Sequence, residues 1–352
     1  MNRSGMERLG MPPVFNPGRQ PLRDLPTAIC LACQWEAVAA KPGNVHRSAD
    51  FADIGLLDFL HSAVAVSNTA RQWLARWSDQ DNGQPPTFGQ FVFEAVQSTR
   101  QLTRSNTNLG ICLLLGPLAE AWVKRFEPIG TSQVGPADSM GSGTLNQAMF
   151  QAWRQQTQAL INSASVEQTQ LIYSAIGLAK PGGMGTVPEA DVAAADALQS
   201  SDTVAQVMRL AVDRDSIAAE YVSGYSITFE KTVPSMAGLL SSGCGLQWTI
   251  IGTYLRLLAD QPDTLIARKV GWDRAREISV WARQLADEFF PHSLKDWASD
   301  DREVACEQSL ADFDFALRSD GNRLNPGTTA DLIAAGLFVA AMGGIISTPV
   351  CW

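Results

Sequence analysis

Apolar residues recur at helical spacing along almost the whole of this chain, and this periodicity is the strongest constraint on its fold. Alternating runs of apolar and polar residues, the pattern of a half-buried strand, are scarce, and the best of them (225–233) is short. The sequence therefore predicts an all-α, single-domain fold with a buried polar site formed by helix ends. Helices are expected at residues 27–40, 54–77, 87–102, 108–126, 145–163, 166–179, 202–222, 237–259, 262–269, 272–287 and 328–342.

The periodicity also suggests where the folded domain begins and ends. Residues 1–24 contain prolines, glycines and arginines without periodicity and are expected to form a flexible N-terminal tail. Residues 25–352 are expected to form one all-helical domain, because 45% of the chain is hydrophobic and only 18% is charged. Within this domain, residues 128–144 are rich in Gly, Ser and Pro and are predicted to be a surface loop.

Charge and composition argue against several classes of protein. The formal net charge of −9 disfavours a nucleic-acid partner, because such a partner needs a basic surface. Neither a signal-peptide pattern nor an apolar run of about 18 residues is found, so we expect a cytoplasmic protein without a membrane partner. The six cysteines show no disulfide pattern. Cys30 and Cys33 are interpreted as small core residues, with a metal or redox role as the alternative.

Polar residues collect in "KPGNVHRSADFADI" (41–54), directly after the first expected helix. Pro42 and Gly43 predict a turn, around which basic side chains are candidates for phosphate binding and aspartates for binding a cation. The alternative is a solvated loop in which Asp53 interacts with the dipole of the next helix. The candidate residues of this segment are Lys41, Asn44, His46, Arg47, Asp50 and Asp53.

Two very apolar helices are each preceded by a cluster of hydrogen-bonding residues, "RSNTN" (104–108) and "NPGTTAD" (325–331). Asn106 or Asn108 is a candidate cap for the first helix, and Thr328 and Asp331 have capping-box spacing in the second. Capping accounts for only part of the first cluster, and a helix N-terminus with spare polar side chains is a site for an anion or a nucleotide. In the second cluster a capping role is expected, and it is compatible with a ligand role at the same helix start. The candidates are Asn106, Thr107, Asn108, Asn325, Gly327, Thr328 and Asp331.

Residues 202–222 contain a carboxylate within an apolar helical pattern. If this segment is one continuous helix, Asp215 lies in the middle of its apolar face, Asp213 on the opposite side, and Arg214 at the edge. A carboxylate in that position is costly unless it is paired, metal-bound or catalytic. The alternative is a buried ion pair with Arg214 or another basic residue.

Two further segments carry basic residues beside helix ends. In "AKPGGMGTV" (179–187), Lys180, Gly182 and Gly183 follow a helix, where they form either a C-cap or a cradle for phosphate. In "PDTLIARKVG" (262–271), Asp263, Arg268 and Lys269 surround a short helix, and a solvated surface is the alternative interpretation.

Taken in order, these motifs resemble the triphosphoribosyl-dephospho-CoA synthase family over roughly residues 27–345. The "KPGNV" turn and the "NPGTTADL" block (325–332) are the most specific parts of the resemblance. The family is all-helical, uses ATP and dephospho-CoA, and makes the prosthetic-group precursor of the acyl carrier proteins of citrate lyase and malonate decarboxylase. The resemblance implies a transferase in cofactor biosynthesis, in which the 2′-hydroxyl of dephospho-CoA, or of a related acceptor, attacks the ribose C1 of ATP and adenine leaves.

This chemistry requires a base, a group that assists the departure of adenine, and Mg²⁺ with cationic side chains for the triphosphate. The resemblance therefore implies Asp215, Asp50 and Asp53 as catalytic candidates and Asp213, Asp215 and Asp331 as metal ligands. The residues expected to bind the nucleotide and its phosphates are Lys41, Asn44, His46, Arg47, Asn106, Thr107, Asn108, Lys180, Gly182, Gly183, Arg214, Arg268, Lys269, Asn325, Gly327 and Thr328.

The chain departs from the family pattern at three of these motifs. The D-x-N-x-x-x-R-G-G block of the synthases reads here as "DTLIARKVG", and their A-H-x-D-M-D segment reads as "SADFADI", which keeps Asp50 and Asp53. Where the synthases proper carry N-T-H-K-G, this sequence has Asn106-Thr107-Asn108-Leu109-Gly110, which indicates a divergent branch. The alternatives are therefore another nucleotide-dependent transferase or phosphohydrolase in cofactor synthesis, or a nucleotide-binding protein without catalysis. A homodimer is one expected assembly.

Overall fold

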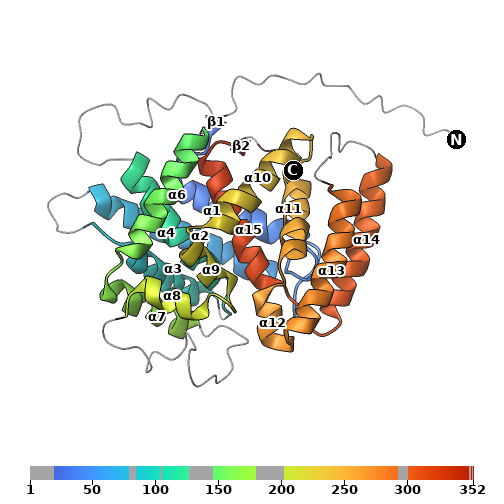
Figure 1. The fold of residues 1–352 in the computed structure, drawn as a ribbon, viewed down its shortest axis with the longest axis horizontal. Helices are drawn as coiled ribbons and strands as arrows, with labels where there is room; N and C mark the ends of the chain where they lie inside the picture. The colour runs from blue at the N-terminus through green and yellow to red at the C-terminus, as the bar shows by residue number, and fades with distance from the viewer. Residues whose placement is uncertain are drawn as a thin grey trace.

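Helices make up nearly all of the regular structure (Figure 1). The computed structural model describes residues 20–78, 85–103, 105–126, 146–179, 202–291 and 300–348, together with residues 350 and 352. Arg104, Lys180, Gly182, Gly183 and the expected loop at 128–144 lie outside the described residues. In chain order the helices are α1 (Leu25–Val38), α2 (Leu56–Ser78), α3 (Phe88–Leu102), α4 (Leu109–Phe126), α6 (Gln147–Asn162), α7 (Val166–Ala179), α8 (Val204–Ala211), α9 (Ser216–Ser223), the π-helix η2 (Ile227–Thr232), α10 (Val233–Ser241), α11 (Leu246–Asp260), α12 (Thr264–Val270), α13 (Trp272–Phe289), α14 (Asp300–Arg318) and α15 (Gly327–Met342).

The last helix, α15, forms the centre of the fold (Figure 1). Its residues from Leu332 to Met342 are all buried, and it packs against α1, α4, α10, α11 and η2. A helix that is apolar on all sides is stable in water only when other helices surround it. Because α15 is held on all sides, its polar N-terminus has a fixed position relative to the neighbouring helices.

The apolar helix α4 contains a proline, and the helical hydrogen bond that it removes is replaced by one from a tyrosine. Pro117 has no backbone N–H, so the carbonyl of Leu113, four residues earlier, loses its helical partner. The Tyr221 hydroxyl donates to this carbonyl at 2.6 Å, and the Tyr225 hydroxyl donates to the carbonyl of Leu114 at 2.9 Å. These bonds tie the segment containing α9 to the middle of α4.

The continuous helix expected at 202–222 is wrong, because the chain forms two helices there. The helix α8 ends at Ala211, and Asp215 adopts an extended conformation (φ −142°, ψ 116°) as the N-cap of α9. Its carboxylate accepts the backbone N–H groups of Ile217 and Ala218, which favours a new helix start over continuation of the old helix. Asp215 therefore does not lie on the face of a helix.

The strand-like pattern at 225–233 is also misleading, because these residues form η2 and the start of α10. The carboxylate of Glu220 accepts the backbone N–H groups of Ile227 and Thr228 and fixes this turn of the chain. Burial raises the pKa of Glu220 to about 7, although hydrogen bonds from Thr228 and Ile227 act in the opposite direction. Tertiary contacts thus override the alternating pattern.

Other differences are smaller. The helix expected at 237–259 is interrupted between α10 and α11, where Gly243 has a φ of +84°. The helix α14 was not predicted from the sequence, because its few apolar residues are scattered among many polar ones and form no clear apolar face. Two residues of the expected tail, Gln20–Pro21 (β1), pair antiparallel with Ser347–Thr348 (β2), so the folded domain begins before residue 25. Among the described helices, none has the length and apolar character that crossing a membrane requires.

Candidate functional site

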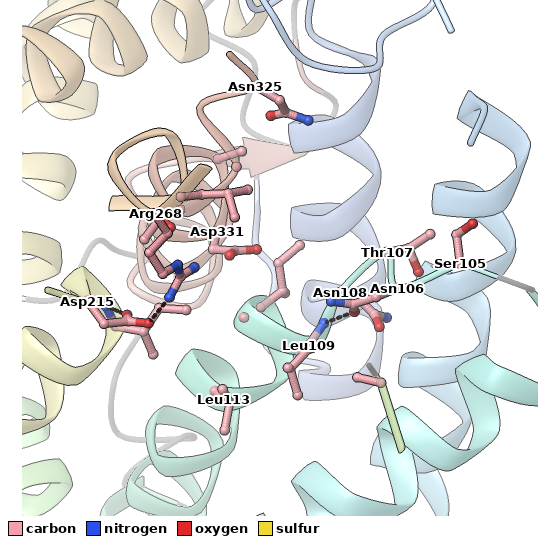
Figure 2. A pocket seen from close by; sticks show the side chains of 18 of the residues that line it. Ser105, Asn106, Thr107, Asn108, Leu109, Leu113, Asp215, Arg268, Asn325 and Asp331 are labelled. Carbon is pink, nitrogen blue, oxygen red and sulfur yellow. Dashed lines mark hydrogen bonds and ion pairs between the residues drawn. The ribbon is translucent and has the colours of Figure 1, made fainter. Parts of the chain in front are cut away.

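A cavity of about 720 Å³ lies where the N-termini of α4, α9, α12 and α15 meet (Figure 2). This volume is within the range of pockets that bind small ligands. Segments that are far apart in the sequence contribute to its wall. The sequence-predicted residues that line it are Asn44, Asp53, Asn106, Thr107, Asn108, Arg214, Asp215, Arg268, Lys269, Asn325, Gly327, Thr328 and Asp331.

The helix N-termini are held at the cavity by side-chain caps. The carbonyl oxygen of the Asn106 side chain accepts the backbone N–H of Leu109 at 3.1 Å, so Asn106 rather than Asn108 caps α4. The Nδ2 of Asn108 instead donates to the Thr99 hydroxyl at 3.1 Å. The starts of α4, α9 and α15 place the positive ends of their dipoles at the cavity wall, and together they favour a bound anion.

Asp263 joins the starts of α12 and α15. Its Oδ1 accepts the N–H groups of Leu265 and Ile266 at 2.8 and 3.1 Å, and its Oδ2 accepts the N–H and the hydroxyl of Thr329, both at 2.7 Å. The residue is only 2% exposed, so the solvated-surface interpretation of 262–271 is wrong at this position. This carboxylate sets the position of α12 and its basic residues relative to α15.

Asp215 is engaged on both of its oxygens. One oxygen caps α9, and the other forms an ion pair with Arg268, with Nη1 and Oδ2 separated by 2.6 Å (Figure 2). An ion pair with a basic residue was the alternative interpretation of the sequence, and the partner is Arg268 rather than Arg214. Since Arg268 lines the cavity, the ion pair holds a guanidinium group at its wall.

Asp331 extends into the cavity between Asp215–Arg268 on one side and Asn106–Asn108 on the other (Figure 2). Enclosure by protein raises the pKa of this carboxyl well above its ordinary value, and the nearby charges of Glu36, Asp263 and Asp215 add to the rise, while Arg268 opposes it. A carboxyl group in these surroundings favours either a proton or a bound cation. Its predicted role as a cap is not observed, because Asp263 accepts from Thr329 at this helix start.

Gly110 makes room for Asp331. A Cβ atom at position 110 would lie 2.0 Å from Oδ2 of Asp331, much closer than any real contact. The absence of a side chain in the first turn of α4 therefore allows the carboxyl group of α15 to reach the cavity. The structure thus gives a steric reason for glycine at position 110, the last residue of the N-T-x-x-G motif.

Lys269 lies beside Arg268 at the cavity wall. Its ammonium group donates to the carbonyl of Asn322 at 2.8 Å. Burial lowers the pKa of Lys269, while the carboxylates of Asp263 and Asp53 act against this effect. Together with Arg214, these residues give the cavity three cationic side chains that the sequence singled out.

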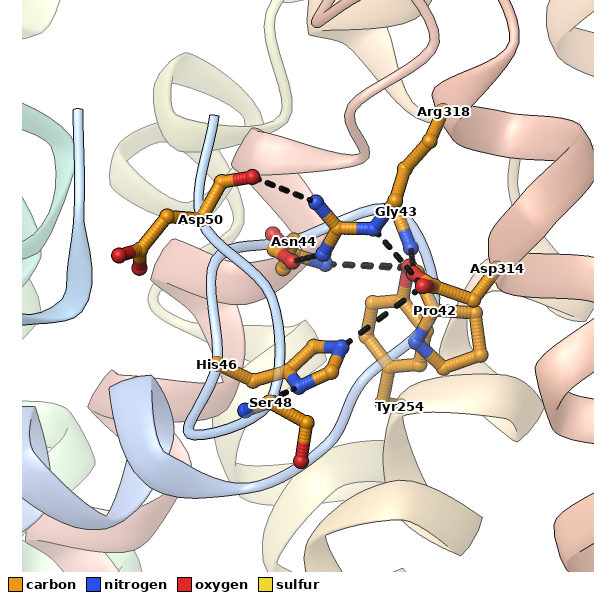
Figure 3. A network of polar contacts seen from close by, with 9 residues as sticks. All are labelled: Pro42, Gly43, Asn44, His46, Ser48, Asp50, Tyr254, Asp314 and Arg318. Atoms are coloured by element: carbon orange, nitrogen blue, oxygen red, sulfur yellow. Dashed lines mark hydrogen bonds and ion pairs between the residues drawn. The ribbon is translucent and has the colours of Figure 1, made fainter. Parts of the chain in front are cut away.

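The turn after α1 positions Asn44 but does not bring most of its other polar residues to the cavity (Figure 3). The Tyr254 hydroxyl donates to the carbonyl of Pro42 at 2.6 Å, and Nδ2 of Asn44 lies 3.2 Å from that hydroxyl. Gly43, with a φ of +77°, donates its N–H to Asp314 at 2.7 Å. These contacts attach the turn to α11 and α14.

Four candidates of the 41–54 segment do not line the cavity. Lys41 is fully buried and its Nζ lies 2.9 Å from the carboxylate of Glu36, so it neutralises an internal charge. His46 accepts the N–H of Ser48 and faces Asp314 at 3.8 Å. Arg47 is exposed, and Asp50 accepts the N–H of Leu56 at the start of α2.

The aspartates expected to bind a metal do not form one cluster. Asp213 is exposed and does not line the cavity, and the described part of the chain contains no group of three or more His, Cys, Asp or Glu side chains that could hold a metal ion. A metal ion at this site would therefore need ligands besides these side chains, from water or from a substrate. Mg²⁺ commonly takes such ligands, since it is bound by one or two carboxylates and substrate phosphates.

Sequence reasoning missed several residues that shape the site. Glu36 and Arg100 line the cavity, and Glu36 was detectable as a carboxylate within an apolar helix. Asp314 and Arg318 hold the Pro42–Asn44 turn from α14, a helix that was not recognised. Burial alone would raise the pKa of Asp314, but hydrogen bonds from His46, Gly43 and Arg318 lower it overall.

Residues 22–348, most of the chain, match the family model described as ATP:dephospho-CoA triphosphoribosyl transferase. This protein belongs to that family. It is thus a transferase of the triphosphoribosyl-dephospho-CoA synthase type, as the sequence motifs predicted. The fold is similar to a crystal structure from Archaeoglobus fulgidus assigned as a triphosphoribosyl-dephospho-CoA synthase, with 19% identity and a TM-score of 0.50, covering 80% of this chain and 100% of that one. The comparison with curated proteins found no match.

Proposed function

We propose that the cavity binds ATP and dephospho-CoA together and transfers the triphosphoribosyl group of ATP to the 2′-hydroxyl of dephospho-CoA. The observation that carries the proposal is that one cavity combines the N-termini of α4, α9 and α15, four cationic side chains (Arg100, Arg214, Arg268 and Lys269) and the enclosed carboxyl group of Asp331. The first two features suit a polyanion, and the third suits a cation that accompanies it.

The triphosphate lies against Arg268, Lys269 and Arg214. Asp215 acts as a positioning residue, because its ion pair fixes Arg268 at the wall and its second oxygen caps α9. This role differs from the metal ligand or base expected from the sequence. Asp263 has a comparable role for α12 as a whole.

Asp331 is the carboxylate that would hold Mg²⁺ brought in with the triphosphate, and Asn44, Asn106 and Thr328 would orient the nucleotides. The carboxylates around Asp331 make an ionised group unfavourable until a cation arrives, which is the chemical environment of a cation site. Bound Mg²⁺ would neutralise phosphate charge. The same negative surroundings stabilise positive charge that develops on the ribose in an oxocarbenium-like transition state.

In this reaction the bond between ribose C1′ and N9 of adenine breaks, and a bond forms between C1′ and the 2′-oxygen of dephospho-CoA. The hydroxyl proton leaves the acceptor, and adenine is released with a proton. The triphosphate stays on the transferred ribose. The enzyme therefore consumes no water and releases no phosphate.

Adenine release tests this proposal. The purified protein is incubated with ATP, Mg²⁺ and dephospho-CoA, and adenine, ADP and phosphate are measured. The proposal expects adenine release that depends on dephospho-CoA, and its loss in Asp331→Asn and Arg268→Ala. Asp213→Asn is the matched control, because this exposed carboxylate lies outside the cavity and should be dispensable.

ADP formation without adenine would instead identify a phosphohydrolase or phosphotransferase, and adenine release with a different acceptor would reassign the acceptor. ATP binding without turnover would indicate a non-catalytic nucleotide-binding protein. The cytoplasmic location and the homodimer remain predictions from the sequence.

A further inference from the structure

The part of the cavity wall that α7, α8 and the first turn of α9 provide is apolar. Helices α7, α8 and α9, which pack against one another, contribute six buried side chains to it, none more than 8% exposed. We call this surface the apolar slot, formed by Ile176, Ala179, Met208, Ala211, Ile217 and Ala218.

Three alanines create the space in this slot. Ala179 is the last residue of α7, Ala211 is the last residue of α8, and Ala218 lies in the first turn of α9. Because each is small and lies where a helix ends or begins, the three helices approach closely while leaving room between their ends. A larger side chain at any of these positions would extend into the cavity.

The floor of the slot, formed by α4, is apolar for a specific reason. Leu113 lines the cavity, and its carbonyl is the one that Pro117 leaves without a helical partner. The Tyr221 hydroxyl donates a hydrogen bond to this carbonyl at 2.6 Å. The acceptor that the proline exposes is therefore not offered to a ligand.

We infer that the apolar slot binds the purine base of ATP, an inference that rests on the proposed function. A purine has two apolar faces, which the slot can cover, and polar atoms around its perimeter that can be directed toward the rim. At that rim lie Arg214 and the Asp215–Arg268 ion pair, from the bend between α8 and α9 and from α12. The slot thus adjoins the cationic wall proposed for the triphosphate.

The pantetheine arm of dephospho-CoA is the alternative ligand for the slot, and it fits the slot less well than a purine does. This arm carries two amide groups, and burying an amide without a hydrogen-bond partner costs about 1–3 kcal/mol in proteins. The described side chains of the slot are all aliphatic or thioether groups and supply no such partner. A purine has no polar group on either face, so its faces can be covered by the slot without this cost, provided that its ring nitrogens and amino group find partners at the rim.

The test fills the slot and compares ligands that do or do not contain the base. Ala218→Leu and Ala211→Leu place extra carbon atoms in the slot, and Ala219→Leu is the matched control on the same helix, at a partly exposed position that does not line the cavity. Binding of ATP and of inorganic tripolyphosphate is measured by calorimetry in the presence of Mg²⁺, and circular dichroism verifies that each variant is folded.

We expect each slot variant to weaken ATP binding about tenfold or more, with tripolyphosphate binding and the KM for dephospho-CoA unchanged. Unchanged ATP binding in both folded variants would overturn the inference, and so would a selective rise in the KM for dephospho-CoA, which would place the acceptor in the slot. If the wild-type protein bound neither ATP nor tripolyphosphate, the proposed function itself would fail.

Discussion

Replacing Asp331 by Asn is expected to make the protein more stable at neutral pH while abolishing triphosphoribosyl transfer. The folded state raises the pKa of Asp331 well above its ordinary value through enclosure and through the charges of Glu36, Asp263 and Asp215. In the unfolded chain this group titrates near its ordinary value of about 3.9. Between these two pKa values only the folded state holds the proton.

The sign of the effect follows from linkage. As the pH rises above about 4, the unfolded chain releases the Asp331 proton and the folded protein does not, so wild-type stability falls with pH. The loss is about 1.4 kcal/mol for each pH unit until the folded pKa is reached. For a chain of 352 residues, an unfolding entropy of about 2 cal/mol/K per residue converts this to about 2 °C in Tm per pH unit. Because Asn does not titrate, the stability of the Asp331→Asn variant does not fall with pH for this reason.

The assay is thermal unfolding of both proteins, followed by circular dichroism from pH 4 to pH 8. The Tm of Asp331→Asn minus that of the wild type should grow as the pH rises and then become constant. Mg²⁺ with ATP should raise the Tm of the wild type more than that of the variant, because the bound cation replaces the proton. Parallel Tm curves across the whole range would refute the electrostatic reasoning, whereas Asp213→Asn should follow the wild type.

Three other changes probe the contacts around the cavity. Gly110→Ala should reduce transfer about 100-fold by displacing Asp331, whose Oδ2 would lie 2.0 Å from the new Cβ, and wild-type activity would disprove the steric argument. The lowered pKa of Asp314 means that its carboxylate stabilises the folded protein, and that this stability is lost as the pH falls through that pKa. Asp314→Asn should therefore make the Tm fall less steeply with decreasing pH. Replacement of the exposed Asp312 by Asn should leave that slope unchanged. Tyr221→Phe should lower the free energy of unfolding, measured in urea, by about 1–3 kcal/mol, because it leaves the Leu113 carbonyl unpaired. The loss should be smaller in a Pro117→Ala background, where residue 117 again has a backbone N–H to donate to that carbonyl. Equal losses in both backgrounds would contradict this account.

Local chemistry along the chain was enough to predict the helical fold and much of the cavity wall. Apolar spacing of about 3.6 residues identifies most helices, because burying one face is what stabilises a helix in water. The clusters at Asn106–Asn108 and Asn325–Asp331 were recognisable because each places more polar side chains before an apolar helix than a single cap requires. Both clusters line the cavity.

Long-range contacts decided the rest. Asp215 is a helix cap whose free oxygen meets Arg268, 53 residues away, so periodicity within 202–222 could not reveal its environment. Lys41 had the sequence context of a phosphate ligand, but the fold buries it against Glu36. Helix α14 and the residues through which it holds the Pro42–Asn44 turn depend on partners about 270 residues away. Spacing along the chain reports which face of a helix is apolar, whereas the partner of a charged group is set by which helices meet, and only the tertiary structure determines that.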